Sequence, residues 1–314
     1  MSSTIRAAPP VMTIVLENCM FSLSLPKLCA ALSAGVVFWG AAAAAPGGSA
    51  SPAAPEGAPK DAASILRICA AEKQPPFSLE DGTGYENKIA VALAEATSRK
   101  PQFVWSDKPA IYLVRDFLDR KLCDVIIGLD TGDSRVLTSR PYFRSGYVFI
   151  SRTDRNLSVH SWSDPVLKSF GHIAVSFGSP SEVMLTEIGL YEEDMAYLYS
   201  LVNFRSPRNQ YTQIEPSRMI SEVVSGNADL AVAFAPEIAR YVKSSTVPLK
   251  MTLVDDDAAR SDGEKIAQRY DQSIGVRRDD QALLDELNEG LVRAKPKIDE
   301  ILASEGIPVL PVTN

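Results

Sequence analysis

Polar side chains that could bind a ligand gather in one segment, between two apolar stretches of the chain. Residues 123–129 and 147–150 are apolar, and the loop between them carries Asp130, Thr131, Arg135, Arg140 and Tyr142. An arginine can hold a carboxylate through two parallel N–H···O bonds, and carboxylate and hydroxyl groups can bind other polar groups of a small ligand. The pattern indicates a loop that lines a ligand cleft and then leads into a second lobe.

Side chains typical of catalytic and metal sites are few and scattered. Neither of the two histidines, His160 and His172, lies at metal-ligand spacing with another ligand, and the chain has no Gly-x-Ser-x-Gly motif and no phosphate-binding loop. The acidic run at residues 255–257 predicts a solvated turn. Glu86, next to Tyr85, is a single carboxylate at a predicted helix start, where the helix dipole favours negative charge. We therefore expect a protein that is not an enzyme and has no metal and no cofactor.

The first half of the chain alternates predicted strands and helices. Apolar runs bounded by Gly, Pro and polar residues predict the strands, and apolar residues at helical spacing predict the helices. Two such crossovers produce a parallel α/β sheet. The expected strands are residues 66–70, 102–105 and 123–129, and the expected helices are residues 85–97 and the segment around Leu113, Phe117 and Leu118.

Two cysteines, Cys69 and Cys123, lie on strands that would be neighbours in this sheet. In an exported chain such a pair favours a disulfide, provided that the register brings the two β-carbon atoms close enough. The alternative is that both are small buried apolar side chains. We predict the disulfide.

The second half repeats this pattern and then returns to the first lobe. Strands are expected at residues 172–177, 201–204, 229–234 and 273–277. One helix is expected to begin at Pro180 and another to end at Gly226. A third helix is expected to carry Leu284, Leu287 and Leu291 on its apolar face and to be interrupted at Pro296. The chain would then cross between lobes twice. The predicted lobes are residues 65–151 with 270–314 and residues 152–269, and the cleft between them is the expected binding site.

The N-terminal region has the pattern of an export signal. Lys27 precedes the apolar residues 28–40, and small side chains follow at residues 41–45. The apolar run is shorter than the roughly 20 residues that span a bilayer, so we expect no membrane anchor after processing. Residues 1–45 are predicted to be a signal peptide with an over-extended start, and residues 46–64, rich in Pro, Gly, Ala and Ser, a flexible leader.

The charge of the chain argues against nucleic acid as a partner. The full sequence has a formal net charge of −7, and without residues 1–45 it would carry 30 basic and 38 acidic residues, a net charge of −8. No basic run is interleaved with aromatic residues, as nucleic-acid-binding surfaces require. We expect a soluble, periplasmic protein.

Several short strings resemble type II periplasmic solute-binding proteins over roughly residues 65–308. They are Pro76-Phe77, the GNAD string at 226–229, and the SIGVR string at 273–277 with Leu284 and Asn288. The resemblance implies an α/β, bilobed fold of two mixed, mainly parallel sheets with a hinge and an interlobe cleft.

Four longer strings are similar to one branch of this superfamily, the MxaJ family, also called MoxJ. They are residues 85–90 (YENKIA), 109–116 (PAIYLVRD), 123–133 (CDVIIGLDTGD) and 140–147 (RPYFRSGY). The family is encoded with the periplasmic, pyrroloquinoline-quinone-dependent methanol dehydrogenase. The string at 109–116 favours this family over XoxJ, which accompanies the lanthanide-dependent dehydrogenase.

Comparison with amino-acid-binding receptors of this fold suggests a cleft that has lost its usual ligand groups. Phe77 matches the aromatic position after the first strand, and Gly178 and Ser179 roughly match the turn that binds an anion. The loop after Gly128 is short, so Arg135 is displaced from the position that binds a carboxylate. Phe234 occupies the position of the aspartate that holds an ammonium group, and an aromatic ring cannot replace that charge. We therefore do not expect an amino acid as ligand.

The resemblance implies a non-catalytic accessory protein that contacts the methanol dehydrogenase during assembly, maturation or activity. The alternative is a periplasmic receptor that delivers a small molecule to an ABC transporter, in keeping with the two-lobe plan. The candidate cleft residues are Phe77, Tyr85, Glu86, Asp130, Thr131, Arg135, Arg140, Tyr142, Gly178, Ser179 and Phe234.

Overall fold

A computed structural model describes residues 64–202 and 213–312. The predicted signal peptide and, apart from Ser64, the predicted leader lie outside these residues. Among the helices of the described residues, none is both long enough and apolar enough to cross a membrane.

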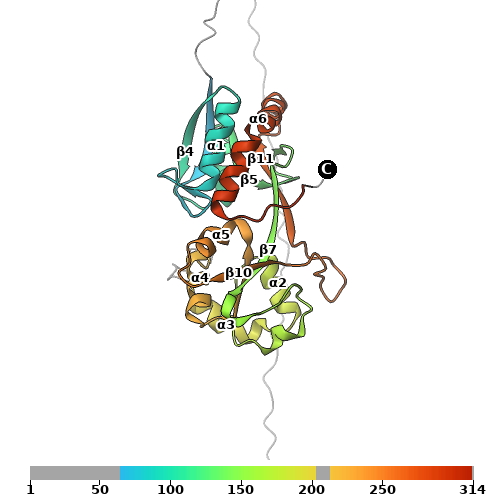
Figure 1. Cartoon of the computed structure of the whole chain (residues 1–314). Coiled ribbons are helices and arrows are strands. Elements are labelled where there is room, and N and C mark those ends of the chain that lie inside the picture. Colours follow the sequence, from blue (N-terminus) through green and yellow to red (C-terminus); the bar gives the residue numbers. More distant parts are fainter. Residues whose placement is uncertain (1–63, 203–212, 313–314) are drawn as a thin grey trace, which may run out of the picture. The chain divides into compact units, whose positions relative to one another are not determined.

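The first lobe is a mixed sheet covered by two long helices (Figure 1). Strand β1 pairs in parallel with β4 and β5, and β11 pairs antiparallel with β5. The helices α1 and α6 pack on each other, and their buried leucines and isoleucines form one cluster with the sheet. The elements are β1 (Ile65–Ala71), β4 (Lys100–Ser106), β5 (Val125–Asp130), β6 (Leu137–Thr138), β11 (Arg269–Val276), α1 (Tyr85–Ala96), α6 (Gln281–Glu305) and the hairpin β2 (Lys73–Gln74) and β3 (Ser78–Leu79).

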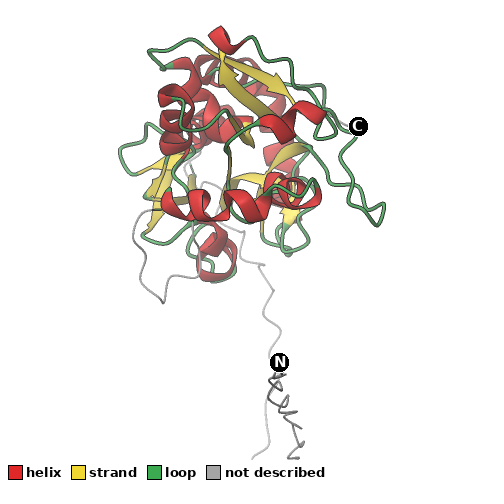
Figure 2. Cartoon of the chain, turned by 90° about the horizontal axis from the view of Figure 1, so that it is seen from below, coloured by secondary structure: helices red, strands yellow, loops and turns green. Residues whose placement is uncertain are grey.

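The second lobe is a smaller mixed sheet surrounded by shorter helices (Figure 2). Strands β8 and β9 are parallel, and β7 pairs antiparallel with both β9 and β10. A separate cluster of buried side chains fills this lobe. Its elements are β8 (Ile173–Val175), β9 (Leu230–Phe234), β10 (Leu249–Leu253), α2 (Pro180–Glu187), α3 (Tyr191–Ser200), α4 (Pro216–Ser225), α5 (Ala235–Lys243), η3 (Thr153–Arg155) and η4 (Pro165–Ser169).

Strand β7 (Phe143–Arg152) belongs to both sheets. Residues 143–146 pair with β11 of the first lobe, and residues 147–150 pair with β9 of the second. Figure 1 shows β7 running from the part that holds β11 and α6 to the part that holds β10 and α2. The exact lobe boundaries near residues 151 and 270 stay a prediction.

A cluster of polar contacts also joins the lobes. Arg240 on α5 donates to the carboxylate of Glu305 on α6, with Nη2–Oε1 at 2.9 Å, and the Glu305 side chain is buried. Lys88 on α1 contacts the same carboxylate at 3.1 Å. Lys243 donates to the carbonyl oxygen of Ser304 at 2.7 Å. The two lobes are therefore held together by charge-assisted bonds in addition to β7.

Three predictions about local structure are wrong. The segment around Leu113 is a 3-10 turn, η1 (Ala110–Tyr112), followed by a π-helical turn, η2 (Val114–Leu118), instead of a regular α-helix. The segment expected as a strand at residues 201–204 is a turn at Leu201 and Val202, because α3 extends to Ser200; its last two residues lie outside the described part.

The third concerns Pro296, which lies inside an uninterrupted α6. Proline removes one helical N–H and clashes with the preceding turn. Here Pro296 is on the exposed face, where water can satisfy the freed carbonyl group. Buried residues on both sides, Leu291 and Ile298, keep the two halves packed on the lobe.

The predicted disulfide between Cys69 and Cys123 is confirmed. Cys69 lies on β1 and Cys123 two residues before β5, with their α-carbon atoms 5.4 Å apart. Leu113, Leu118 and Ile126 pack around the bridge. The bridge therefore fastens the irregular η1–η2 segment to the sheet.

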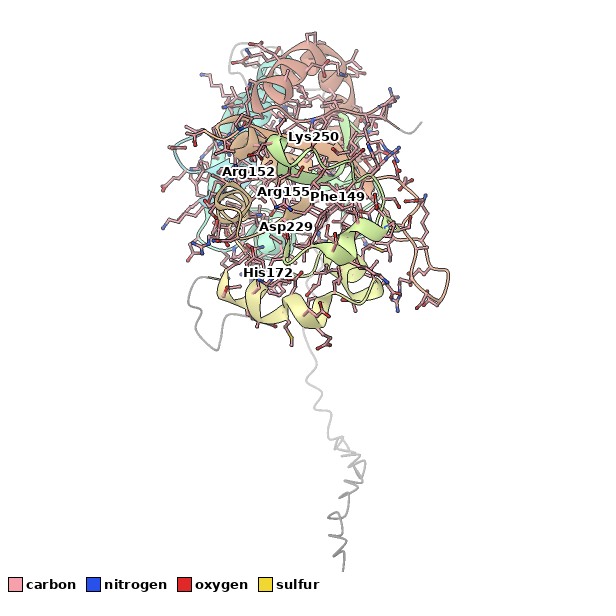
Figure 3. All side chains as sticks on the ribbon, turned by 60° about the horizontal axis from the view of Figure 1, so that its bottom comes forward. Phe149, Arg152, Arg155, His172, Asp229 and Lys250 are labelled. Atoms are coloured by element: carbon pink, nitrogen blue, oxygen red, sulfur yellow. A yellow bond between two sulfur atoms is a disulfide. The ribbon has the colours of Figure 1, made fainter. Side chains whose placement is uncertain are left out.

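Asp229, the last residue of the GNAD string, has a structural role in the second lobe. Asp229, in the turn before β9, accepts from the backbone N–H of Gly171 at 2.7 Å and pairs with Arg155 at 2.6 Å. Figure 3 shows Arg155 and Asp229 side by side. Asp229 thus ties the start of β9 to η3 and to the loop before β8.

We expect the double variant Cys69→Ala, Cys123→Ala to be less stable than the wild type by about 2–4 kcal/mol. The bridge closes a loop across 54 residues, and loops of this length restrict the unfolded chain by that order. Urea unfolding with and without reductant measures the difference. Reductant should lower the stability of the wild type and leave the variant unchanged; equal sensitivity would contradict the role of the bridge.

We expect Glu305→Gln to lower the free energy of unfolding by about 2–4 kcal/mol. Breaking a buried ion pair costs ~3–5 kcal/mol, and the partial exposure of Arg240 reduces this figure. Denaturant unfolding at neutral pH measures the loss. Glu300→Gln on the same helix removes an exposed pair with Lys297 and should cost less than about 1 kcal/mol. Similar losses in both variants would rule out a special role for Glu305.

Candidate functional site

A pocket lies at the carboxyl ends of β1 and β5, the edge of an α/β sheet where ligands commonly bind. Its volume is about 250 Å³. Most of its wall is apolar and comes from the first lobe. It is lined by Ile68, Cys69, Ala70, Ala71, Gln74, Phe77, Ser78, Glu86, Asn87, Ala110, Leu113, Ile126, Ile127, Gly128, Leu129, Asp130, Phe234 and Gln272, and is called the first pocket below.

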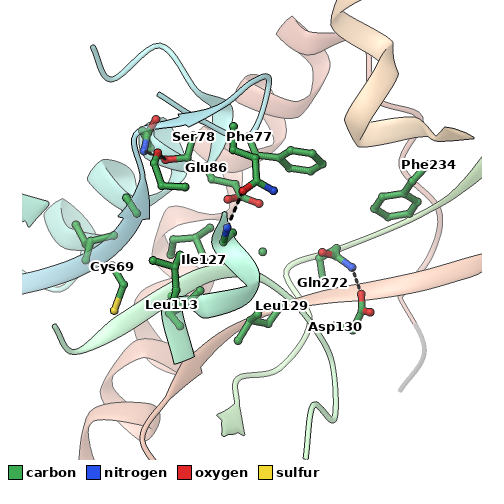
Figure 4. A pocket seen from close by; sticks show the side chains of 18 residues that line it. Cys69, Phe77, Ser78, Glu86, Leu113, Ile127, Leu129, Asp130, Phe234 and Gln272 are labelled. Atoms are coloured by element: carbon green, nitrogen blue, oxygen red, sulfur yellow. Dashed lines mark hydrogen bonds between the residues drawn. The ribbon is translucent and has the colours of Figure 1, made fainter. Parts of the chain in front are cut away.

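Two aromatic rings border the first pocket from different lobes. Phe77 follows the cis peptide bond between Pro75 and Pro76, and Phe234 ends β9. Figure 4 shows the two rings at the border of the pocket, each on a different segment of the chain. Since β7 fixes one lobe against the other, the distance between the rings depends on the tertiary structure and not on local sequence.

Glu86 contributes a partly buried carboxyl group to these walls. It lies in the first turn of α1, and its carboxyl group points into the pocket beside Phe77 (Figure 4). Gly128 makes this possible: a β-carbon at Gly128 would lie 1.9 Å from Oε1 of Glu86, and the φ of Gly128 is +77°. The backbone of β5 therefore approaches the carboxyl group closely.

Burial raises the pKa of Glu86 to about 8, because the ionised form loses its water there. Within the described residues its carboxyl group forms no hydrogen bond and no ion pair. The backbone N–H groups of Tyr85 and Glu86 are occupied by the carbonyl oxygens of Pro76 and Phe77, at 3.1 and 3.0 Å. The carboxyl group of Glu86 is therefore mostly protonated at neutral pH.

Asp130 forms the second acidic group of the first pocket. It ends β5 and accepts a hydrogen bond from the side-chain amide of Gln272 at 2.6 Å. Partial burial raises its pKa above the ordinary value, although the bond from Gln272 opposes the shift. Figure 4 shows this pair on the side of the pocket facing Phe234.

A second pocket, of about 230 Å³, lies between the β2–β3 hairpin and the second lobe. Phe77 borders it as well as the first pocket, and Gly178 and Ser179 contribute the turn before α2. That turn is occupied by its own helix: Gly178 N–H donates to Glu182 at 2.6 Å, and Ser179 caps the N–H of Glu182 at 3.2 Å. A negatively charged Glu182 therefore fills the position where an anion would bind.

Glu237 is an acidic group of the second pocket that the sequence analysis missed. It lies in the first turn of α5, and burial together with the charge of Glu215 raises its pKa to about 7. Tyr147, Gln272 and Tyr270 were missed too. The sequence offered one indication of these residues, namely that they lie at or next to the ends of predicted strands.

The remaining predicted site residues lie away from both pockets. Thr131 bonds to β11, with Oγ1 2.6 Å from Oγ of Ser273. Arg135 is exposed and paired with Asp133 at 2.6 Å. The backbone of Arg140 is bonded to Asn288 at 2.8 Å, and its side chain is exposed.

Tyr85 and Tyr142 lie behind the pockets. Both are 2% exposed, and Tyr85 packs against Phe77 with ring centroids 5.5 Å apart. The hydroxyl group of Tyr142 has no hydrogen-bond partner among the described residues. Of the predicted set, the structure brings together Phe77, Glu86, Asp130 and Phe234 at the first pocket.

In the part of the chain that the structure describes, the first pocket has no basic side chain that would hold a carboxylate: neither Lys nor Arg lines it. Within residues 64–202 and 213–312, no group of three or more His, Cys, Asp or Glu side chains is arranged to hold a metal ion. The arrangement suits a small, mainly apolar ligand with a hydrogen-bond donor or a positive charge.

Comparison with known proteins identifies close relatives. The chain is 62% identical over 257 residues to "Protein MoxJ" of Methylorubrum extorquens AM1. The aligned region covers 82% of this chain and 85% of that protein. No protein-family model matches the chain.

Two solved structures are similar over most of the described residues. The MxaJ structure from Methlophaga aminisulfidivorans MPT has 50% identity and a TM-score of 0.75, and covers 78% of this chain and 100% of its own. The periplasmic binding protein XoxJ from Methylobacterium extorquens AM1 has 24% identity and a TM-score of 0.57, and covers 79% and 100%. The predicted bilobed periplasmic-binding-protein fold is confirmed.

We expect Glu86→Gln to change how stability depends on pH. Between about pH 4.5 and 8 the folded chain keeps a proton on Glu86 that the unfolded chain has lost, so wild-type stability falls as pH rises through this window. Glutamine cannot titrate. Relative to the wild type, the variant should therefore become more stable from pH 5 to pH 8, as measured by urea unfolding.

Glu95→Gln, an exposed position on the same helix, is the matched control and should follow the wild type. Glu237 titrates in all three proteins, so only differences from the wild type are compared. Parallel curves for Glu86→Gln and the wild type would contradict a raised pKa at Glu86.

Proposed function

The chain belongs to the MxaJ family, also called MoxJ, and from this membership we propose that it is a non-catalytic accessory protein of the periplasmic, pyrroloquinoline-quinone-dependent methanol dehydrogenase system. It acts by protein–protein contact in assembly, maturation or activity of the dehydrogenase. The observation that carries the proposal is the 62% identity to MoxJ over 257 residues.

The chemistry of the cleft supports an accessory role over that of an amino-acid receptor. Arg135, the candidate for a carboxylate, is exposed and paired with Asp133. The turn at Gly178 is occupied by Glu182. Phe234 stands where an acid would hold an ammonium group. The carboxylate of a bound amino acid would therefore have no positively charged partner among the described residues of the cleft. Burying an unpaired charge is strongly unfavourable.

The same pockets support a non-catalytic role. Glu86 is a lone carboxyl group among apolar walls, without a nucleophile or a second acid within hydrogen-bond reach among the described residues. General acid–base catalysis needs such a partner or a positioned substrate proton.

The identities favour the dehydrogenase system of the MxaJ family over the lanthanide-dependent one. The chain is 50% identical to an MxaJ and 24% identical to a XoxJ of solved structure. The string at 109–116, which resembles MxaJ more than XoxJ, forms η1 and the first part of η2. Ala110 and Leu113 of this string line the first pocket, and the disulfide holds it in place.

The first pocket favours a second candidate function, a receptor for a small molecule. A cavity of about 250 Å³ remains between the lobes' aromatic rings. A bound ligand would stabilise the protein by about 2.7 kcal/mol at a hundredfold excess over its dissociation constant.

The test of the main proposal is binding of the processed chain to purified methanol dehydrogenase, measured by pull-down with quinone-loaded and quinone-free enzyme at low and moderate salt. We expect binding to the methanol dehydrogenase of the same organism. Preference for the quinone-free form indicates a maturation role, and equal binding indicates a structural or electron-transfer role. An amino-acid-binding receptor of the same fold is the matched negative control.

A deletion strain provides the second readout. We expect lower dehydrogenase activity or assembly without the protein, restored by the wild-type chain supplied on a plasmid. Normal active enzyme in the deletion strain, together with no binding in the pull-down, would refute the accessory role and leave the receptor.

A further inference from the structure

We propose that the first pocket binds a small organic cation, one that carries an ammonium group and no carboxylate. Phe77, Phe234, Glu86 and Asp130 form the site. The inference goes beyond the accessory function and does not depend on it, since the pocket lies within this chain.

The charged groups of the pocket all have the same sign. Glu86 and Asp130 are acidic, and among the described residues no Lys or Arg side chain lines the cavity. Gln74, Ser78, Asn87 and Gln272 supply the other polar groups, and most of these bond to the protein itself: Ser78 donates to the carbonyl oxygen of Ala71 at 2.7 Å, and Asn87 donates to Ser78 at 3.0 Å. The acceptors left for a ligand are therefore carboxylate oxygens, those of Glu86 above all, because Asp130 already accepts from Gln272.

Glu86 is placed as a site for a cation and not as a helix cap. In the described part of the chain nothing donates to its carboxyl group, and the first N–H groups of α1 are occupied by carbonyl oxygens of Pro76 and Phe77. A buried acid without a partner is unfavourable when ionised. An ammonium ion in the pocket would supply both the opposite charge and the N–H donors.

The aromatic walls suit the same ligand. A cation is attracted to the face of an aromatic ring, and the attraction is stronger where water is excluded. Phe77 is held by Tyr85, with centroids 5.5 Å apart. Phe234 is held by Tyr147 at 5.7 Å and Tyr270 at 6.0 Å. The rings are thus fixed before a ligand enters, which reduces the entropy cost of binding.

The size and composition of the pocket limit the ligand further. Its volume of about 250 Å³ is below the roughly 300–1,000 Å³ of sites for drug-sized molecules. A carboxylate on the ligand would face Glu86 and Asp130 without a basic partner. The ligand is therefore a small amine or quaternary ammonium compound, and an amino acid or betaine is disfavoured.

Binding of a cation should depend on pH because Glu86 must ionise. Tyr142 and Tyr85 face Glu86 from the loop before β7 and from α1, and Asp130 lines the same cavity from β5. The two tyrosines have pKa values raised by burial and stay neutral. Glu237 of the neighbouring second pocket, with a pKa raised to about 7, also titrates in this range, but it does not line the first pocket. Among the groups that line the first pocket, the charge that changes between pH 6 and 8 is on Glu86, and affinity should rise over this range by up to tenfold per unit.

The test is isothermal titration of the processed wild-type protein with matched probes. Choline and n-butylammonium carry the positive charge; 3,3-dimethylbutan-1-ol is the neutral isostere of choline, and glycine betaine adds a carboxylate to the same cation. We expect at least one of the two cations to bind, and the alcohol and the betaine to bind at least tenfold more weakly than the better cation.

Variants locate the site. Glu86→Gln should weaken binding of the better cation at least tenfold and abolish its pH dependence, and Phe234→Leu should weaken it a few-fold. Glu95→Gln on the exposed face of α1 should bind as the wild type does. Thermal unfolding of each variant confirms that it is folded, and Asp130→Asn at the pocket edge is a second variant should Glu86→Gln fold poorly.

Three outcomes would overturn the proposal. One is that neither cation binds to the folded wild-type protein. Another is that the neutral alcohol binds as tightly as choline. The third is that folded Glu86→Gln or Asp130→Asn binds the cation with unchanged affinity. None of these results bears on binding to the methanol dehydrogenase, so failure here and failure of the accessory role are distinguishable.

Discussion

The pairing of β7 with both sheets is the constraint on which the rest of the structure depends. Its first residues continue the sheet of the first lobe through β11, and its last residues continue the sheet of the second through β9. The bond from Arg240 on α5 of the second lobe to the buried Glu305 on α6 of the first also joins the lobes. Because the lobes are joined in two places, Phe77 and Phe234 meet across one pocket although 157 positions separate them in sequence.

Among the described residues, the cleft has acidic groups but not the carboxylate-binding groups expected of an amino-acid receptor. The arginine and the anion-binding turn expected of an amino-acid receptor are occupied by Asp133 and Glu182. The acidic side remains, as Glu86 and Asp130 around an apolar cavity. A carboxyl group in such a place is either protonated or paired with a cation. Its protonation state therefore depends on whether a cation is bound in the pocket.

An accessory role and a ligand pocket are compatible in one molecule. Membership of the MxaJ family is based on 62% sequence identity over 257 residues. The proposed contact with the dehydrogenase would use the outer surface of the protein and would leave the pocket free for a ligand. Ala110 and Leu113, from one of the strings that resemble the family, line the pocket, and Leu113 packs in one cluster with Cys69 and Cys123. A ligand in the pocket would therefore contact this segment of the chain.

The sequence by itself determined the strands β1, β4, β5, β7, β8, β9 and β11, four of the α-helices and the end of α4 at Gly226, because hydrophobic period and glycine act over short distances. It also indicated the Cys69–Cys123 bridge, which the pairing of β1 with β5 then allowed. Only the tertiary structure decided the fate of Pro296, Arg135 and Glu86. Pro296 is tolerated because both halves of α6 pack on the lobe, and Arg135 pairs with its neighbour Asp133. From the sequence alone, Glu86 is expected to be an ordinary charged residue at a helix start. In the structure, Gly128 and the aromatic rings, which are distant in sequence, surround its carboxyl group and exclude water.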